Sequence, residues 1–234
     1  MKKFLYYTFI FIIALIIVGC TTNNTVTPAQ EFKEEYESLN GVKNSRGVEH
    51  RTITISEDNP YIKVKPEEIV KMMDEKETFY LYVGDGLCPW CRSVLEKSIE
   101  MAKKYHVEKI YYVEIWDDEG TEIFRDKYEL KDGEVVKTID GEKSYHTLLK
   151  RFDTLLSDYT LTNENNEKVE VGEKRIYAPN FFKIEKGKAT KMIEGYSDSL
   201  TDPRGELTEE ILKDEEEQFT KLFSNENVCT AEGC

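Results

Sequence analysis

Hydrophobic positions in the middle of the chain change their spacing in a regular order, and this order predicts an α/β domain. RTITIS at 51–56 alternates and is rich in β-branched residues, whereas TFYLYV at 78–83 is almost wholly apolar, as in a strand buried on both faces. A third candidate strand, EKIYYVEIW, covers 108–116. Apolar residues at helical spacing follow Pro66 and Pro89, which predicts that a helix begins at each proline. Strand, helix, strand, helix and strand in this order are typical of a parallel sheet with crossover helices.

The pattern is less regular further along the chain. We expect an insertion of charged loops over about 117–173 around one helix with an apolar stripe, for which Ser144 is the expected N-cap. Segments 175–184 and 188–195 then predict two strands joined by a turn, and 207–223 predicts a final amphipathic helix.

The first residues have the pattern of a leader. Two lysines precede an apolar run at 4–18, which fits the core of a signal peptide and is shorter than the roughly 20 residues needed to cross a bilayer. The run ends in IVGC, which resembles a bacterial lipobox, in which Cys20 is acylated and becomes the new N-terminus. We therefore expect a lipoprotein signal peptide at 1–19, and a lipid anchor and tether with a short helix at 20–50. An uncleaved anchor with an incidental Cys20 is the alternative.

Composition and charge narrow the classes of function. Hydrophobic residues make up 39% of the chain and charged residues 33%, which excludes a polytopic membrane protein, a fibre and a wholly disordered chain. The net charge of −14 would repel a phosphate backbone, so no nucleic-acid partner is expected. The 234 residues allow one enlarged domain, which we place at 51–224, followed by a cysteine-containing tail at 225–234.

Two of the five cysteines form a CPWC motif, Cys88 to Cys91. Cys88 lies just outside a helix that begins at Pro89, where free N–H groups and the helix dipole favour a thiolate. Such a thiolate can attack a disulfide, and Cys91, one turn into the helix, can then resolve the mixed disulfide. An inert structural disulfide is the alternative. Zinc would need two further ligands, and the three scattered histidines offer no such spacing, so we expect neither a metal nor a cofactor.

A strand that leads into CPWC, followed much later by IYAP at 176–179, a predicted hairpin and a terminal helix, resembles the thioredoxin-like superfamily. More narrowly, the chain is similar to lipid-anchored thioredoxin-like proteins related to bacteriocin transport accessory proteins. The resemblance implies a thioredoxin-like α/β fold, with a central mixed sheet flanked by helices and a helical insertion before the cis-proline strand. It also implies that Pro179 is cis and packs against CPWC, while Ala178 offers its backbone to an extended substrate. Trp90 would shape the contact surface or be packed inside.

The chain departs from the thioredoxin pattern near the motif. Leu87 stands where thioredoxins carry tryptophan, and Tyr82 replaces the buried aspartate that accepts the proton of the buried thiol. Asp85 and Glu114 are candidate substitutes for this proton acceptor. The alternative for each is a solvated residue of a loop or sheet edge.

A second cysteine pair, Cys229 and Cys234, ends the chain. So short a loop would stabilise the fold only weakly if it closed as a disulfide, so the pair is either a local clip or a second redox pair.

Together these features predict an extracytoplasmic thiol–disulfide oxidoreductase, lipid-anchored to the bacterial cell membrane. Its expected partners are protein thiols and disulfides of exported proteins, and a further redox protein. The alternative is a non-catalytic thioredoxin-fold accessory module of a secretion or assembly system, with a structural CPWC disulfide.

Overall fold

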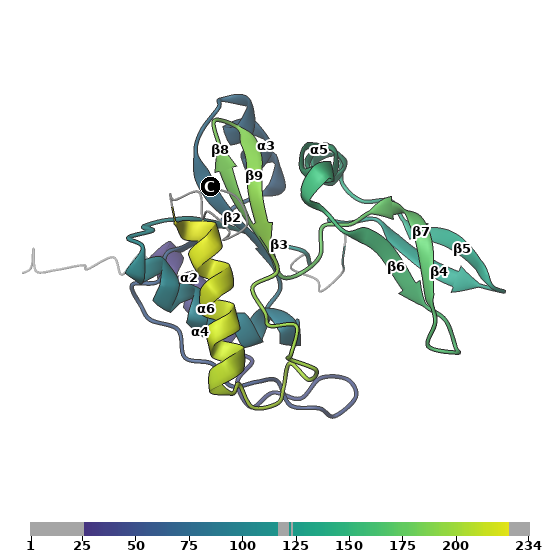
Figure 1. Cartoon of the computed structure of the whole chain (residues 1–234), viewed down its shortest axis with the longest axis horizontal. Coiled ribbons are helices and arrows are strands. Elements are labelled where there is room, and N and C mark those ends of the chain that lie inside the picture. The colour runs from purple at the N-terminus through teal and green to yellow at the C-terminus, as the bar shows by residue number, and fades with distance from the viewer. Residues whose placement is uncertain (1–25, 117–121, 123, 225–234) are drawn as a thin grey trace, which may run out of the picture.

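Strand β2 (Phe79–Gly84) lies at the centre of a five-stranded mixed sheet, as its apolar sequence predicts. The computed structural model describes residues 26–116, 122 and 124–224. The strand order is β1-β3-β2-β8-β9 (Figure 1). β3 (Ile110–Glu114) pairs in parallel with β2 and with β1 (Tyr61–Lys63). β8 (Asn180–Glu185) is antiparallel to both β2 and β9 (Lys188–Ile193).

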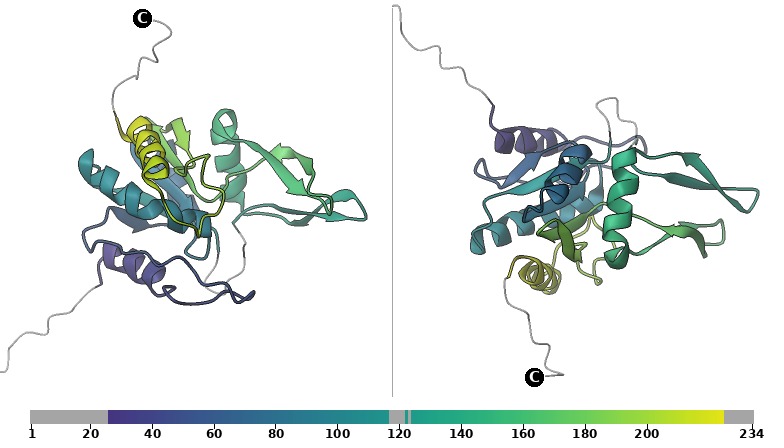
Figure 2. Two further views of the ribbon diagram at one scale, coloured as in Figure 1. Left: turned by 60° about the horizontal axis from the view of Figure 1, so that its bottom comes forward. Right: turned by 90° about the horizontal axis from the view of Figure 1, so that it is seen from above.

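Helices cover both faces of this sheet, so the molecule has three layers (Figures 1 and 2). One apolar cluster lies under α2 (Pro28–Glu37), α4 (Pro89–Lys104) and α6 (Glu209–Phe223). A second cluster lies under α3 (Pro66–Asp74) and α5 (Lys143–Phe152). This mixed α/β architecture, with a central mixed sheet flanked by helices, is consistent with a thioredoxin-like fold.

The strand expected at 51–56 does not form. Buried and solvent-facing residues do alternate along this segment: Ile53 and Ile55 are buried in the core, and Thr52 and Thr54 are exposed. However, side chains of α2 and of the turn after it bind its backbone in place of a neighbouring strand. Asn40 bonds both the N–H and the C=O of Ile53, while Glu37 accepts from the N–H of Ile55. Alternation predicts which residues are buried, but it does not identify the hydrogen-bond partner.

The helical insertion at 117–173 is not confirmed, because the helix in this segment belongs to the core. Phe152 of α5 stacks on Phe182 of β8, with 4.3 Å between ring centroids. Glu142, rather than Ser144, is the N-cap of this helix. Two β-hairpins flank α5 and extend together away from the central sheet (Figure 1). Their strands are β4 (Lys127–Lys131), β5 (Glu134–Ile139), β6 (Asp158–Thr162) and β7 (Lys168–Lys174), and a short 3-10 turn, Asp153–Leu155, precedes β6.

Helix α2 packs into the core, although it precedes residue 51. Phe32 stacks on Tyr61 with ring centroids 4.2 Å apart, and Tyr36 is fully buried. Thr27 caps the helix through a capping box with Gln30. The folded core therefore includes α2. Among residues 26–116, 122 and 124–224, no helix is long and apolar enough to cross a membrane.

Candidate active site: a dithiol at the start of helix α4

The turn between β2 and α4 places Cys88 at the N-cap of the helix. The Asp85 carboxylate accepts a hydrogen bond from the Leu87 N–H (2.8 Å), and the Asp85 carbonyl accepts one from the Cys88 N–H (3.2 Å). Pro89 follows as the first helical residue, where its missing N–H has no intrahelical partner to lose. The Sγ of Cys88 accepts a hydrogen bond from the N–H of Cys91 (3.4 Å), so the thiol itself caps the helix.

The two thiols have different environments, and both are free. A hydrogen bond from the Cys91 thiol and the N–H groups of the first helical turn lower the pKa of Cys88, although its partial burial acts the other way. Cys91 is fully buried, and burial raises its pKa well above the usual range. Cys88 is therefore the better nucleophile, and Cys91 is a thiol that must lose its proton inside the protein.

The predicted IYAP segment lies beside this dithiol. The Ala178–Pro179 peptide bond is cis, which confirms the expectation for Pro179. Pro179 is buried immediately before β8, and the Cys88 thiol donates a hydrogen bond to the Ala178 carbonyl (3.4 Å). The fold thus brings the motif and the cis-proline together across 90 residues of sequence.

Aromatic and apolar side chains border Cys88. Trp90 is half-buried and packs against Tyr196, with 4.7 Å between ring centroids. Burial and the neighbouring Glu194 raise the pKa of the Tyr196 hydroxyl, and the charges of Asp198 and Cys88 add smaller contributions in the same direction. Leu87 is 44% exposed. Leu87 precedes Cys88 in the chain and Trp90 follows it by two residues; we call these two side chains and Tyr196 the apolar border of the site, on which a substrate chain could pack. The sequence did not indicate Tyr196.

The candidate proton acceptors lie at the same end of the sheet. Glu114 on β3 is in register with Gly84 and forms an ion pair with Lys63. Burial raises the pKa of Glu114, and the Lys63 pair opposes this shift. Asp85 is 4% exposed, so it is not a solvated loop residue, and burial raises its pKa to about 6.

Asp85→Asn should remove a pH dependence of stability. The folded chain holds the Asp85 proton more tightly than the unfolded chain does, so folding takes up protons between about pH 4 and pH 6. The free energy of unfolding should therefore fall by about 3 kcal/mol as pH rises through this window. Asparagine can still accept the hydrogen bond from the Leu87 N–H, but it does not ionise. The free energy of unfolding of Asp85→Asn should therefore not show this fall with pH. Urea unfolding at several pH values measures it, and a difference between the two proteins that stays constant from pH 4 to pH 7 would contradict it.

Three potential ligand atoms lie close together where the β4–β5 hairpin meets α5: those of Asp126 before β4, Asp140 after β5 and His146 on α5. The Nε2 of His146 lies 2.9 Å from the Asp126 carboxylate. The ammonium of Lys137 pairs with Asp126 (3.0 Å) and with Asp140 (2.9 Å). Lys137 therefore already provides the positive charge that these carboxylates attract, and the cluster is explained as an ion-pair network.

Sequence reasoning missed Arg92, the residue after the resolving cysteine. Its side chain is fully buried, and it donates hydrogen bonds to oxygen atoms of α2, of the loop at Arg51 and of the turn before Cys88. A buried arginine beside a CxxC motif has no periodic pattern that would reveal it. The candidate residues Cys20, Cys229 and Cys234 lie outside the described residues.

No protein-family model and no curated protein matches this chain. Among solved structures, it is similar to a thioredoxin-fold protein from Helicobacter pylori. The two share 16% identity and a TM-score of 0.24, over 81% of this chain and 96% of that chain. A likeness this weak says nothing about activity. The strand order, the cis-proline and the dithiol at the start of α4 are the features of this molecule that are consistent with a thioredoxin-like fold.

Proposed function

We propose that this protein is a thiol–disulfide oxidoreductase in which Cys88 is the nucleophile and Cys91 the resolving thiol. The main support is the Cys88 thiol, which caps α4 with a lowered pKa, directly beside a buried second thiol and the Ala178 carbonyl. An extended substrate would lie along Ala178 and Pro179, against the border formed by Leu87, Trp90 and Tyr196.

The reaction is a two-step exchange. The Cys88 thiolate attacks one sulfur of a substrate disulfide, and the other sulfur leaves as a thiolate, which gives a mixed disulfide. Cys91 then loses its proton and attacks Cys88 Sγ, so the bond to the substrate breaks and a Cys88–Cys91 disulfide forms. The substrate disulfide is reduced and the dithiol oxidised by two electrons, and the reverse sequence oxidises a substrate dithiol.

We further propose that the protein acts outside the cytoplasm as a lipoprotein anchored through Cys20. This proposal rests on the apolar run at 4–18, the lipobox-like IVGC and the resemblance to lipid-anchored thioredoxin-like proteins. Its substrates would then be disulfides of exported proteins, where disulfides persist, and another redox protein would restore the dithiol.

A soluble form that begins after Cys20 should accelerate the reduction of insulin by dithiothreitol, measured as turbidity. The lowered Cys88 pKa provides thiolate near neutral pH, and Cys91 releases the product. The matched control replaces Cys229 and Cys234 with serine, which should preserve the rate if the terminal pair is a local clip. No acceleration over dithiothreitol alone, together with failure to refold a scrambled disulfide protein, would contradict the proposed function.

The second candidate is a non-catalytic accessory module, and the lobe of two hairpins favours it. Tyr128 of β4 and Tyr159 of β6 contact each other edge to face, so the hairpins form one unit beyond the central sheet. Such an extension would suit docking to a secretion or assembly complex. An unreactive Cys88 in the insulin assay would support this candidate.

A further inference from the structure

Tyr82 of β2 lies with Cys91 in one buried cluster. Both side chains are fully buried, and the Tyr82 hydroxyl opposes the rise that burial causes in the pKa of the Cys91 thiol. The ring leans over Gly84, where a Cβ atom would collide with the Tyr82 hydroxyl, so the glycine makes room for this arrangement. On its other side, the Tyr82 hydroxyl lies 3.0 Å from the hydroxyl of Tyr36 on α2.

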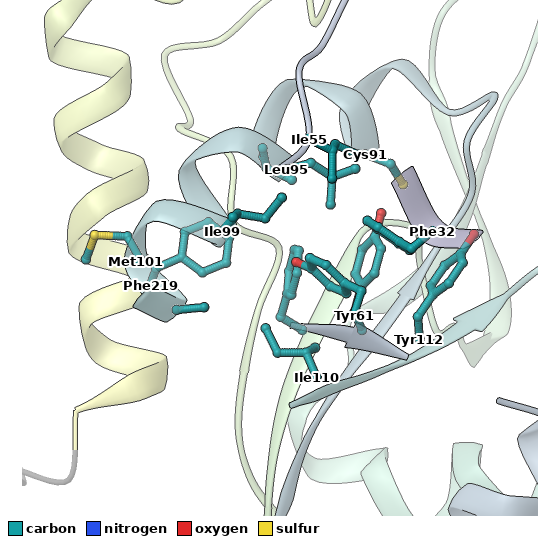
Figure 3. Packing of buried hydrophobic residues seen from close by; sticks show 14 of the residues in the cluster. Phe32, Ile55, Tyr61, Cys91, Leu95, Ile99, Met101, Ile110, Tyr112 and Phe219 are labelled. Carbon is teal, nitrogen blue, oxygen red and sulfur yellow. The ribbon is translucent and has the colours of Figure 1, made fainter. Parts of the chain in front are cut away.

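The hydroxyl chain continues from Tyr36 to the edge of the core. The Tyr112 ring packs against the Tyr36 ring, with 6.1 Å between ring centroids, and stacks on Tyr82 at 5.3 Å. The Tyr112 hydroxyl donates to the Glu35 carboxylate at 2.8 Å. Glu35 has 22% of its side chain exposed and also pairs with Lys63 at 2.9 Å. Figure 3 shows Cys91 of α4 and Tyr112 of β3 among the residues of this one buried cluster. The Glu35 carboxylate, at the far end of this series of hydroxyls, reaches solvent.

The resolving step needs such a route because Cys91 is sealed from water. Its thiol must lose a proton before it attacks, and no solvent reaches its sulfur directly. Asp85, the nearby carboxylate, accepts its hydrogen bond from the Leu87 N–H, which leaves the Tyr82 hydroxyl, in the same buried cluster as the thiol, as the candidate first acceptor. A neutral tyrosine is a poor base. However, its oxygen can accept a proton while its own O–H proton passes to the next acceptor.

We propose that the hydroxyls of Tyr82, Tyr36 and Tyr112 form a proton path between the buried Cys91 thiol and the Glu35 carboxylate. The inference rests on the proposed function. As Cys91 attacks the mixed disulfide, its proton moves to Tyr82, and each tyrosine passes one proton onward until Glu35 is protonated. Every tyrosine begins and ends neutral. The net change is one proton moved from sulfur to carboxylate, and it reverses when the Cys88–Cys91 disulfide is opened.

The test separates the two steps of exchange in the full chain, with Cys20, Cys229 and Cys234 replaced by serine. A chromogenic aromatic disulfide releases one coloured thiolate when Cys88 attacks and a second when Cys91 resolves. Tyr82→Phe keeps the ring and removes the hydroxyl. We expect it to slow the second release about 100-fold and to leave the first release unchanged.

Tyr61→Phe is the matched control. Tyr61 is equally buried in the same cluster, but its hydroxyl bonds Ser98 Oγ (2.6 Å) and lies outside the path. Its second release should keep the wild-type rate. The path also predicts that Tyr82→Phe and Glu35→Gln are not additive, because two breaks in one series block the same transfer.

Equal second-release rates in the wild type and Tyr82→Phe would overturn the proton path and leave the oxidoreductase intact. Additive slowing by Tyr82→Phe and Glu35→Gln would also overturn it. A wild-type chain that releases no second thiolate would instead contradict the proposed function.

Discussion

Cys88→Ser should lower the rate of disulfide exchange by at least about 1000-fold, because a serine hydroxyl is not ionised near neutral pH and cannot attack sulfur. Cys91→Ser should behave differently. It keeps the nucleophile and removes the resolving thiol, so the mixed disulfide with the substrate should accumulate. The contrast between the two variants identifies which sulfur attacks first.

Non-reducing electrophoresis and intact-mass measurement follow both outcomes. After reaction with an unfolded disulfide-containing protein, Cys91→Ser should carry the substrate chain on Cys88, and reductant should release it. Cys88→Ser should carry none. Accumulation on Cys88→Ser, or equal activity of both variants, would contradict the assigned roles. In cells, the Cys91→Ser variant should retain its partners covalently, and exported proteins among them would support an extracytoplasmic location.

A third variant tests why Cys88 is reactive. The Cys91 thiol is the largest influence that lowers the pKa of Cys88. Serine at 91 keeps a hydrogen-bond donor, whereas alanine does not. The pH profile of Cys88 alkylation should therefore lie at higher pH in Cys91→Ala than in Cys91→Ser.

Much of the central sheet could be predicted because its strands are short and apolar. The run at 78–83 identified β2, and CPWC placed the start of α4 at Pro89, where the helix begins. The hairpins were missed because their strands are half-exposed and charged, which resembles a loop. One available indication was Asp132-Gly133, whose positive φ angles form the two-residue turn between β4 and β5.

The site could be predicted only where local motifs define it. Cys88 and Cys91 lie on one helical turn, and Pro179 belongs to a recognisable strand opening. Tyr36 and Arg92 could not be found in this way, because their roles come from contacts between α2 and α4. Such pairings between distant segments leave no fixed spacing in a single sequence.

Arg92 connects these segments, and its replacement should have the largest effect on stability. The fully buried guanidinium donates to the carbonyls of Arg51 (2.8 Å), Tyr36 (2.8 Å) and Gly86 (3.3 Å). It also donates to the Asn40 side chain (2.7 Å). Arg92→Met should lower the free energy of unfolding by about 3–5 kcal/mol, since several buried acceptors lose their donor together.

Lys103→Met is the matched control on the same helix. Lys103 is half-exposed and pairs with Asp58 at the surface, where solvent screens such a pair and it contributes little to stability. Urea unfolding of both variants measures the difference. Buried ion pairs can sometimes be replaced by apolar residues without loss, but the partners of Arg92 include backbone carbonyls that no substitution removes. A change below about 1 kcal/mol for Arg92→Met would contradict this account.

The same replacement should affect exchange through Tyr36. Arg92 holds the Tyr36 carbonyl of α2 against α4, so it fixes the distance between the Tyr36 and Tyr82 hydroxyls. Without this hydrogen bond, α2 should move away from the dithiol, and the second thiolate release should slow while the first stays near its wild-type rate. Lys103→Met should change neither release. A loss of stability in Arg92→Met with an unchanged second release would show that the arginine supports the fold without positioning the proton path.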